Sequence, residues 1–184
     1  MNLFEYQAKE AFRECGITTP RGVLVRSVEE LDAAFAETGF PCVLKSQVLR
    51  GGRGKAGLIR VVGDAETGKK EAGELFASGH NVRMLLVEQA VDIAREIYLS
   101  MTVDPVSGTA LLMGCAEGGV DIESLAATQP EKIVRVHVDM AEGLGGYHVN
   151  NLIYGMGLSG EEAKQVGAAA RGLYKVFRAR DAQL

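Results

Sequence analysis

The spacing of apolar residues along the chain predicts four helices. Apolar side chains recur three and four positions apart near both ends of the sequence, the spacing that places them on one helix face. Ser27 and Glu30 have the pattern of a capping box at the start of the second helix. The predicted helices are 3–15, the segment between Ser27 and Gly39, a weaker helix over 64–78, and a final helix that opens at Ser159 and presents Ala163, Val166, Ala170, Leu173, Tyr174 and Phe177.

Short apolar runs rich in β-branched residues predict strands between these helices. The turn sequence DPVSG at 104–108 joins two of the strands, so 96–116 should form a hairpin. Because strands and helices mix without strict alternation, the pattern predicts an α+β fold in two lobes rather than one doubly wound sheet. The predicted strands are 21–27, 41–48, 57–62, 83–91, 96–104, 109–116 and 132–139.

Composition and charge narrow the class of protein. The 184 residues suit one domain or two small lobes, and 47% hydrophobic residues are enough for a buried core. A net charge of -4 argues against nucleic-acid binding, and no apolar run approaches the roughly 20 residues that span a membrane. The start, MNLFEYQAKE, lacks the pattern of a signal peptide. Three widely spaced cysteines in apolar segments favour reduced core thiols, so a cytoplasmic location is expected.

A glycine-rich stretch, VLKSQVLRGGRGKAG (43–57), contains the G-x-G-x-x-G spacing that ends at Gly57. A Walker A loop is excluded because Leu49 and Ala56 stand where it requires Gly and Ser or Thr. A Rossmann turn is excluded because the β-branched run LIRVV follows Gly57, where a helix is required. The remaining arrangement is a strand, a glycine turn and a second strand.

Such a hairpin can close over a phosphate chain, because glycines let backbone N–H groups approach anionic oxygens closely. Lys45 lies within the apolar strand before the loop, where its charge must be compensated, and a bound phosphate would do this. The alternative is a mobile loop that carries solvated Arg50, Arg53 and Lys55. Both interpretations stay open on this pattern alone.

Two carboxylates mark candidate contacts for the rest of a nucleotide. Glu88 ends one apolar strand and Glu96 begins the next. A carboxylate at a strand end can accept a hydrogen bond from an exocyclic amine, and another can hold the vicinal hydroxyls of a ribose. The alternative is that both are solvated charges at strand ends.

Four segments together resemble the N-terminal part of the succinyl-CoA synthetase (succinate–CoA ligase) β subunits. They are MNLFEYQAKE, VLKSQVLRGGRGKAG, LVEQAVDIAREIYL and EGGVDIE. The resemblance runs from Met1 to Leu184. The β chains of malate–CoA ligase and the ATP-citrate lyase family share much of this pattern, so a related acyl-CoA synthetase stays open. A nucleotide-binding module that is not an enzyme is a further alternative.

The resemblance implies an ATP-grasp fold, in which two α+β lobes clamp a nucleotide. A smaller, mobile lobe over about 21–103 would carry the glycine loop, and 1–20 and 104–184 would belong to the larger lobe. In the family, a strand after Arg-Asp leads to the Asn and Asp ligands of Mg²⁺. This chain ends at RDAQL. A C-terminally truncated domain is therefore expected, with its magnesium ligands beyond Leu184, weak nucleotide binding and no activity as an isolated fragment.

Seven nucleotide-binding residues follow from the resemblance. Lys45 would contact the phosphates, Gly52, Arg53 and Gly54 would form the loop over them, Glu88 and Val91 would line the adenine pocket, and Glu96 would hold the ribose. In the segment EGGVDIE, the roles of Glu117 and Glu123 stay open, because Glu117 and the two glycines after it also fit a turn that closes the hairpin.

The family's reaction needs a second subunit. An α/β complex interconverts succinate, CoA and ATP with succinyl-CoA, ADP and phosphate, a step of the tricarboxylic acid cycle. The phosphohistidine lies on the α subunit, so the resemblance implies an α-subunit partner and no catalytic residue in this chain. His80, His137 and His148 are expected to be structural or at the surface. Pro20 favours ATP over GTP.

Overall fold

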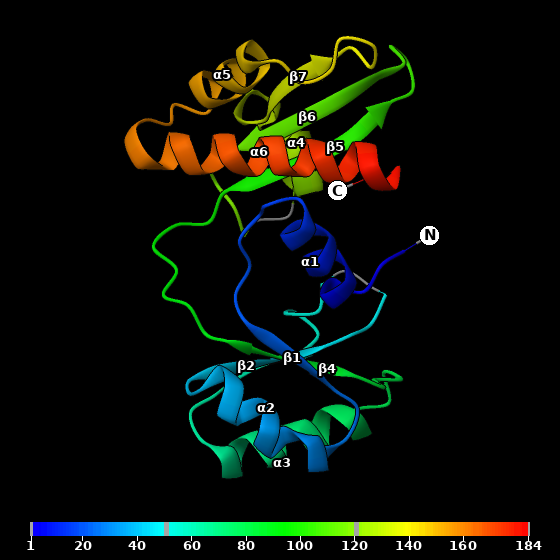
Figure 1. Cartoon of the computed structure of the whole chain (residues 1–184), viewed down its shortest axis with the longest axis vertical. Helices are drawn as coiled ribbons and strands as arrows, with labels where there is room; N and C mark the ends of the chain where they lie inside the picture. Colours follow the sequence, from blue (N-terminus) through cyan, green and yellow to red (C-terminus); the bar gives the residue numbers. More distant parts are fainter. Residues whose placement is uncertain (1, 50–51, 120–121, 184) are drawn as a thin grey trace. The chain divides into compact units, whose positions relative to one another are not determined.

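The computed structural model describes residues 2–49, 52–119 and 122–183, which form two compact units (Figure 1). Unit 1 comprises Met1–Ala11 and Thr18–Asp92, and unit 2 comprises Phe12–Ile17 and Ile93–Leu184. Each unit has a hydrophobic core and a sheet of its own. Helix α1 (Glu5–Glu14) contributes residues to both units. The lobe boundaries that the family resemblance implies stay a prediction.

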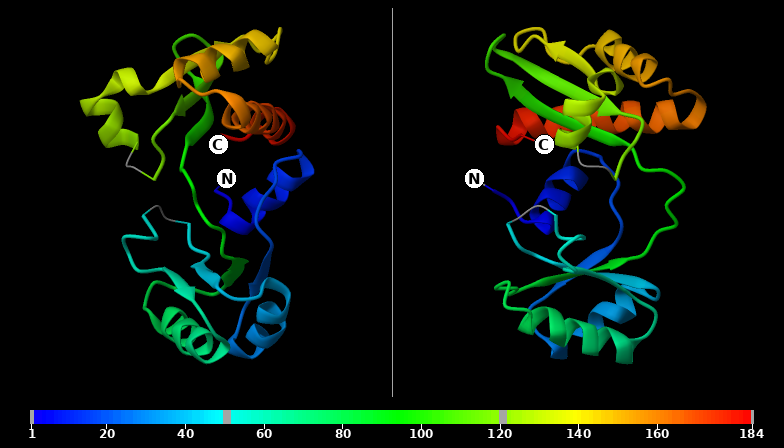
Figure 2. Two further views of the ribbon diagram at one scale, coloured as in Figure 1. Left: turned by 90° about the vertical axis from the view of Figure 1, so that its left-hand side faces the viewer. Right: turned by 180° about the vertical axis from the view of Figure 1, so that it is seen from behind.

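Unit 1 is built on a four-stranded antiparallel sheet with the order β1-β4-β2-β3. Cys42, Leu44 and Ser46 point to the buried face of this sheet, as the alternation of a strand requires. Helices α2 and α3 cover that face (Figure 2) and close the core around Leu31 and Val87. The elements after α1 are β1 (Gly22–Val25), the 3₁₀ turn η1 (Val28–Glu30), α2 (Leu31–Thr38), β2 (Cys42–Ser46), β3 (Ile59–Val62), α3 (Ala65–Ala77) and β4 (Leu85–Gln89).

The strands and helices predicted for unit 1 are confirmed, but the capping box at Ser27 is wrong. The segment after Ser27 starts as the 3₁₀ turn η1, and the Ser27 side chain makes no capping hydrogen bond. The Glu30 carboxylate accepts a hydrogen bond from the backbone N–H of Arg26 at 2.7 Å instead. A 3₁₀ turn has fewer residues per turn than an α-helix, so the capping-box geometry, which assumes an α-helical first turn, does not form.

Unit 2 is built on a three-stranded antiparallel sheet with the order β5-β6-β7. Helices α5 and α6 pack on one face of the sheet (Figure 2). Leu152 and Phe177 of these helices share a buried core with Met101 and Leu112 of the sheet. Helix α4 belongs to a smaller apolar cluster around Cys115. The elements are β5 (Tyr98–Asp104), β6 (Thr109–Cys115), α4 (Ile122–Thr128), the 3₁₀ turn η2 (Pro130–Lys132), β7 (Val134–Val138), α5 (Gly146–Gly155) and α6 (Gly160–Arg180).

The pattern of apolar residues predicted most of unit 2 and missed two helices. The hairpin over 96–116 is confirmed as β5 and β6, which pair from Tyr98 opposite Cys115 to Asp104 opposite Thr109. The stripe on the last helix is also confirmed, since Val166, Ala170, Leu173 and Phe177 are buried. Helices α4 and α5 were not predicted, because α4 has 7 residues and α5 begins and ends in glycine.

All three cysteines are free thiols. Cys42 and Cys115 are buried, as expected of core thiols, whereas Cys15 is half-buried. Among the helices that the structure describes, none combines the length and the apolar composition needed to cross a bilayer.

Candidate functional site

Strand register in unit 1 places Lys45 and Glu88 on the same face of the sheet. Lys45 pairs with Leu86, and Val43 pairs with Glu88, so these four residues share a face. It is the face opposite to the one that α2 and α3 cover, because Leu44, between Val43 and Lys45, points into their core. The sheet therefore presents a lysine and a glutamate as diagonal neighbours on two central strands.

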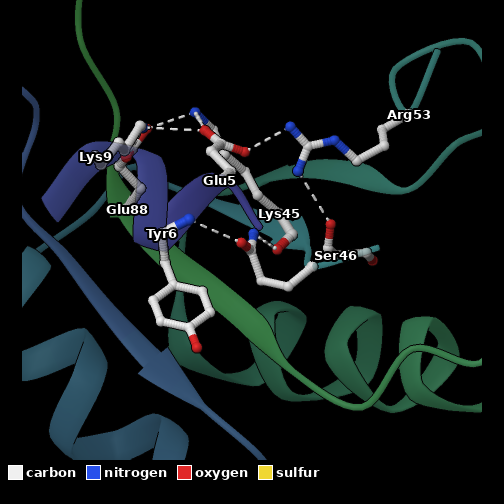
Figure 3. A network of polar contacts seen from close by, with 8 residues as sticks. Glu5, Tyr6, Lys9, Lys45, Ser46, Arg53 and Glu88 are labelled. Carbon is white, nitrogen blue, oxygen red and sulfur yellow. Dashed lines mark hydrogen bonds and ion pairs between the residues drawn. The ribbon is translucent and has the colours of Figure 1, made fainter. Parts of the chain in front are cut away.

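Helix α1 adds two charged residues to this face, one helical turn apart. Lys45 Nζ lies 3.2 Å from Glu5 Oε1 and also pairs with Glu88. Lys9 Nζ lies 3.1 Å from the same Glu5 oxygen and pairs with the other oxygen of Glu88 (Figure 3). The two lysines and the two carboxylates thus alternate around a closed ring of ion pairs.

Arg53 of the glycine loop joins the ring through Glu5. Its Nη2 atom lies 2.8 Å from Glu5 Oε2, and its Nη1 donates a hydrogen bond to the backbone oxygen of Ser46 at 3.2 Å (Figure 3). One carboxylate therefore bridges the lysine of strand β2 and the arginine of the loop. Glu5, Lys9, Lys45, Arg53 and Glu88 are called the charge cluster below.

The charge cluster is partly buried, so its members perturb one another. Burial raises the pKa of Glu5, but the nearby Lys45, Lys9 and Arg53 together bring that pKa below its ordinary value. Burial lowers the pKa of Lys45, but Glu88 and Glu5 bring it above its ordinary value. Three cations face two carboxylates, so one positive charge is left over. A net positive charge of this kind favours an anionic ligand.

The charge of Lys45 does not require a bound phosphate for its compensation. Its charge was expected to require a ligand, and the protein itself supplies two carboxylates for it. Glu5 and Lys9 were not predicted for the site. Their signal in the sequence is the i,i+4 pair of opposite charges in a helix, which usually marks a solvated face. Only the packing of α1 on the sheet shows that this pair faces Lys45.

The glycine loop is a hairpin, as predicted. Strands β2 and β3 pair antiparallel from Cys42 opposite Val62 to Lys45 opposite Ile59, so a strand follows the loop where a Rossmann turn would require a helix. Gly52 has a φ of 70° and lies in open space, and Gly54 also has no neighbour that a Cβ would meet. The backbone around these two glycines is therefore accessible to a ligand. Arg50 and Gly51 lie outside the described residues.

The remaining predicted contacts fall in different parts of the chain. The Glu88 side chain is only 4% exposed and is occupied by Lys9 and Lys45. Val91 follows strand β4 and is 55% exposed. Glu96 is exposed and belongs to unit 2, whereas the other six predicted residues belong to unit 1. Lys45, Arg53 and Glu88 are thus brought together in one cluster.

The histidines of unit 2 have local partners, as expected of structural or surface residues. His148 is buried, and its Nδ1 accepts a hydrogen bond from the backbone N–H of Gly145 at 3.0 Å. His137 Nδ1 lies 3.0 Å from Thr109 Oγ1 at the edge of the sheet. Within the described ranges, no group of three His, Cys, Asp or Glu side chains is arranged to hold a metal ion.

Curated proteins of similar sequence include subunits of two CoA ligases. The ADP-forming sulfoacetate-CoA ligase subunit SauC of Bilophila wadsworthia is 76% identical over 184 residues, all of this chain and 49% of that protein. The ADP-forming succinate–CoA ligase subunit beta of Rubrobacter xylanophilus is 44% identical over the whole chain and 49% of its own length. This chain therefore spans about half the length of the curated relatives it matches.

Solved structures and a family model agree on the architecture. The crystal structure of PH1788 from Pyrococcus horikoshii aligns with a TM-score of 0.77 at 19% identity, over 96% of this chain and 77% of that one, which is a likeness of fold. The family model of the ATP-grasp domain matches residues 2–184. The expected fold class is confirmed, and the chain belongs to the ATP-grasp domain family.

Proposed function

We propose that unit 1 binds the phosphate groups of ATP or ADP through the charge cluster and the glycine loop. The observation that carries this proposal is the excess of one positive charge in a partly buried cluster beside open loop glycines. Polyphosphate oxygens accept several hydrogen bonds at once, from an ammonium, a guanidinium and backbone N–H groups. Lys45, Arg53, Gly52 and Gly54 supply these three kinds of donor.

Glu5 has a specific part in this proposal. Its two carboxylate oxygens contact Lys45 and Arg53, the two cations assigned to phosphate. Glu5 is thus an internal anion that holds both cations near each other when no nucleotide is bound. A phosphate group carries more charge than a carboxylate, so it can take over these two contacts when it enters. Lys9 and Glu88 would remain paired beneath it.

The contacts to the rest of the nucleotide stay as predicted from the sequence. We propose adenine contacts at Glu88 and Val91 and a ribose contact at Glu96. The ion pairs give Glu88 a second task, since it orients Lys45 from the neighbouring strand. A preference for ATP over GTP, indicated by Pro20, is part of this proposal. We assign no magnesium ligand and no chemical step to this chain.

For the whole protein, we propose an ADP-forming acid–thiol ligase that joins CoA to a small acid with two anionic groups. Sulfoacetate is favoured, because the relative named for it is 76% identical, and succinate is the second candidate, because relatives named for it are 44% identical. The partner would be an α-type subunit that carries a phosphohistidine. A cytoplasmic location belongs to the same proposal.

Replacement of Lys45 by alanine tests the phosphate role. We expect Lys45→Ala to weaken ADP binding to this chain by about tenfold to a hundredfold, the value of one charge-assisted hydrogen bond. Isothermal titration calorimetry measures this directly. Lys70→Ala is the matched control, because it removes the same charge from α3, on the other side of the sheet, where Lys70 is exposed. Equal ADP affinity in Lys45→Ala and the unsubstituted chain would refute the proposal.

A further inference from the structure

The segment before β5 and the segment after β6 are joined by hydrogen bonds next to Glu96. The Gly118 N–H donates a hydrogen bond to the backbone oxygen of Glu96 at 2.8 Å. Arg95 Nη2 donates to the backbone oxygen of Ala116 at 3.1 Å, and Arg95 Nη1 pairs with Glu162 at 2.8 Å. These contacts continue the pairing of the two strands past their ends. The backbone of Glu96 is therefore fixed, although its side chain is exposed.

The glycines at 118 and 119 lie against Glu96, and a Cβ added at either position would force a neighbouring group to move. A Cβ built on Gly118 would lie 2.6 Å from the carbonyl carbon of Glu96. A Cβ built on Gly119 would lie 2.2 Å from Glu96 Oε2, far inside van der Waals contact. Gly119 also has a φ of 69°, in the left-handed region. The Glu96 carboxylate thus rests directly on the Gly119 backbone.

We propose that Gly118 and Gly119 are positioning residues for the carboxylate that receives a nucleotide ribose. Gly118 holds the Glu96 backbone, and Gly119 leaves the space that the carboxylate occupies. A side chain that is ordered before binding loses less conformational entropy when its ligand arrives. The carboxylate can then accept hydrogen bonds from the two vicinal hydroxyls. This inference rests on the proposed function, in which Glu96 contacts the ribose.

A turn that merely closes the hairpin would not need this contact. Gly108, at the other end of the same hairpin, shows what a turn alone requires: its φ is 68°, and a Cβ there would meet nothing within 4 Å. Gly108 and Gly119 therefore share a positive φ, and of these two only Gly119 touches a carboxylate. This difference assigns a role to the two glycines of the EGG segment, whereas Glu117 pairs with Lys132.

Gly119 and Gly108 provide a test variant and a matched control for one experiment. ADP and 2′-deoxy-ADP are titrated into the full chain by calorimetry, for the unsubstituted protein and for the Gly119→Ala and Gly108→Ala variants. Gly119→Ala should weaken ADP by about tenfold, the loss of one hydrogen bond to a charged group, and should leave 2′-deoxy-ADP nearly unchanged. Gly108→Ala carries the same backbone strain and should leave the preference for ADP intact. Equal weakening of both nucleotides by Gly119→Ala, or no weakening of ADP, overturns the proposal.

A second variant and a second background keep the test independent of folding defects. Gly119→Asn places a Cβ at the same point in a residue that tolerates the left-handed region, so it should lose the same discrimination. In a Glu96→Ala background, Gly119→Ala should add nothing, because the group that it displaces is gone. A further tenfold loss there would show that Gly119 acts elsewhere. If the unsubstituted chain binds no ADP, the proposed function fails and this inference with it; if it binds both nucleotides equally, only the ribose assignment fails.

Discussion

Glu5 is the residue whose importance the structure reveals most directly. It lies on a helix that the sequence shows only as amphipathic, yet it touches three of the four other members of the charge cluster. Lys45 is half-buried and paired with two carboxylates, so its position in an apolar strand does not by itself require a ligand. The excess positive charge and the open glycines support a phosphate site more strongly than the burial of one lysine.

Removal of the negative charge at Glu5 should strengthen anion binding. Glu5→Gln leaves the cluster with one more unit of positive charge and frees both phosphate cations, so we expect ADP to bind about tenfold more tightly. Calorimetric titration of ADP measures the change. Glu10→Gln is the control, because it removes the same charge from an exposed position of the same helix. Weaker binding in Glu5→Gln would show that Glu5 supports the phosphate site rather than occupying it.

Stability should depend on pH through the same carboxylate. The pKa of Glu5 is below its ordinary value of 4.5 in the folded chain, so its stabilising contribution is complete above that value and is lost as the pH falls through the lowered pKa. We expect the unfolding free energies of the unsubstituted chain and Glu5→Gln to differ at neutral pH and to converge in acid. Urea unfolding at several pH values tests this. A difference that stays constant down to about pH 3 would contradict it.

At the scale of elements, caps can be compared between helices α3 and α6. Asp64 caps α3, where its carboxylate accepts hydrogen bonds from the Thr67 N–H at 2.8 Å and from Thr67 Oγ1 at 2.9 Å. Ser159 occupies the same position before α6 and makes no capping hydrogen bond. Two residues that look equally suited to the role in sequence therefore differ in what they do.

Because Asp64 caps its helix and Ser159 does not, replacing each of them with alanine should change the thermal stability by different amounts. Asp64→Ala should lower the midpoint of thermal unfolding by roughly 2–4 °C, because it leaves an N–H at the start of α3 without a partner. Ser159→Ala should change the midpoint little, since it removes no side-chain hydrogen bond. Circular dichroism melting curves of the two variants make the comparison. Equal losses in both would mean that the helix starts are stabilised by other contacts.

At the scale of the whole molecule, the nucleotide contacts and the choice of acid substrate can be tested separately. The residues assigned to nucleotide lie in this chain, which spans about half the length of its curated relatives. We expect the full-length protein with its α-type partner to form a CoA thioester from sulfoacetate with a higher kcat/KM than from succinate. Release of ADP in the presence of CoA measures both reactions. A preference for succinate would leave the nucleotide site unchanged and overturn the choice of acid.

The sequence by itself determined the local structure, because hydrophobic periodicity and turn residues act over a few positions. It predicted the glycine hairpin, the β5–β6 hairpin and the buried stripe of α6. It also marked Lys45, Arg53 and Glu88, which the structure brings together. Short helices such as α4 escaped prediction, since seven residues carry too little periodicity.

Only the tertiary structure decided which charges face one another. Glu5 and Lys45 are 40 residues apart in the chain, and Glu88 lies a further 43 residues along. Their contact depends on strand register and on the packing of α1, and neither can be read from the local pattern of apolar and polar residues. The same holds for Gly119. In the sequence it looks like any other turn glycine, and only the tertiary structure places its backbone against the carboxylate of Glu96. Long-range packing sets such contacts, because it fixes the distance between groups that the sequence keeps apart.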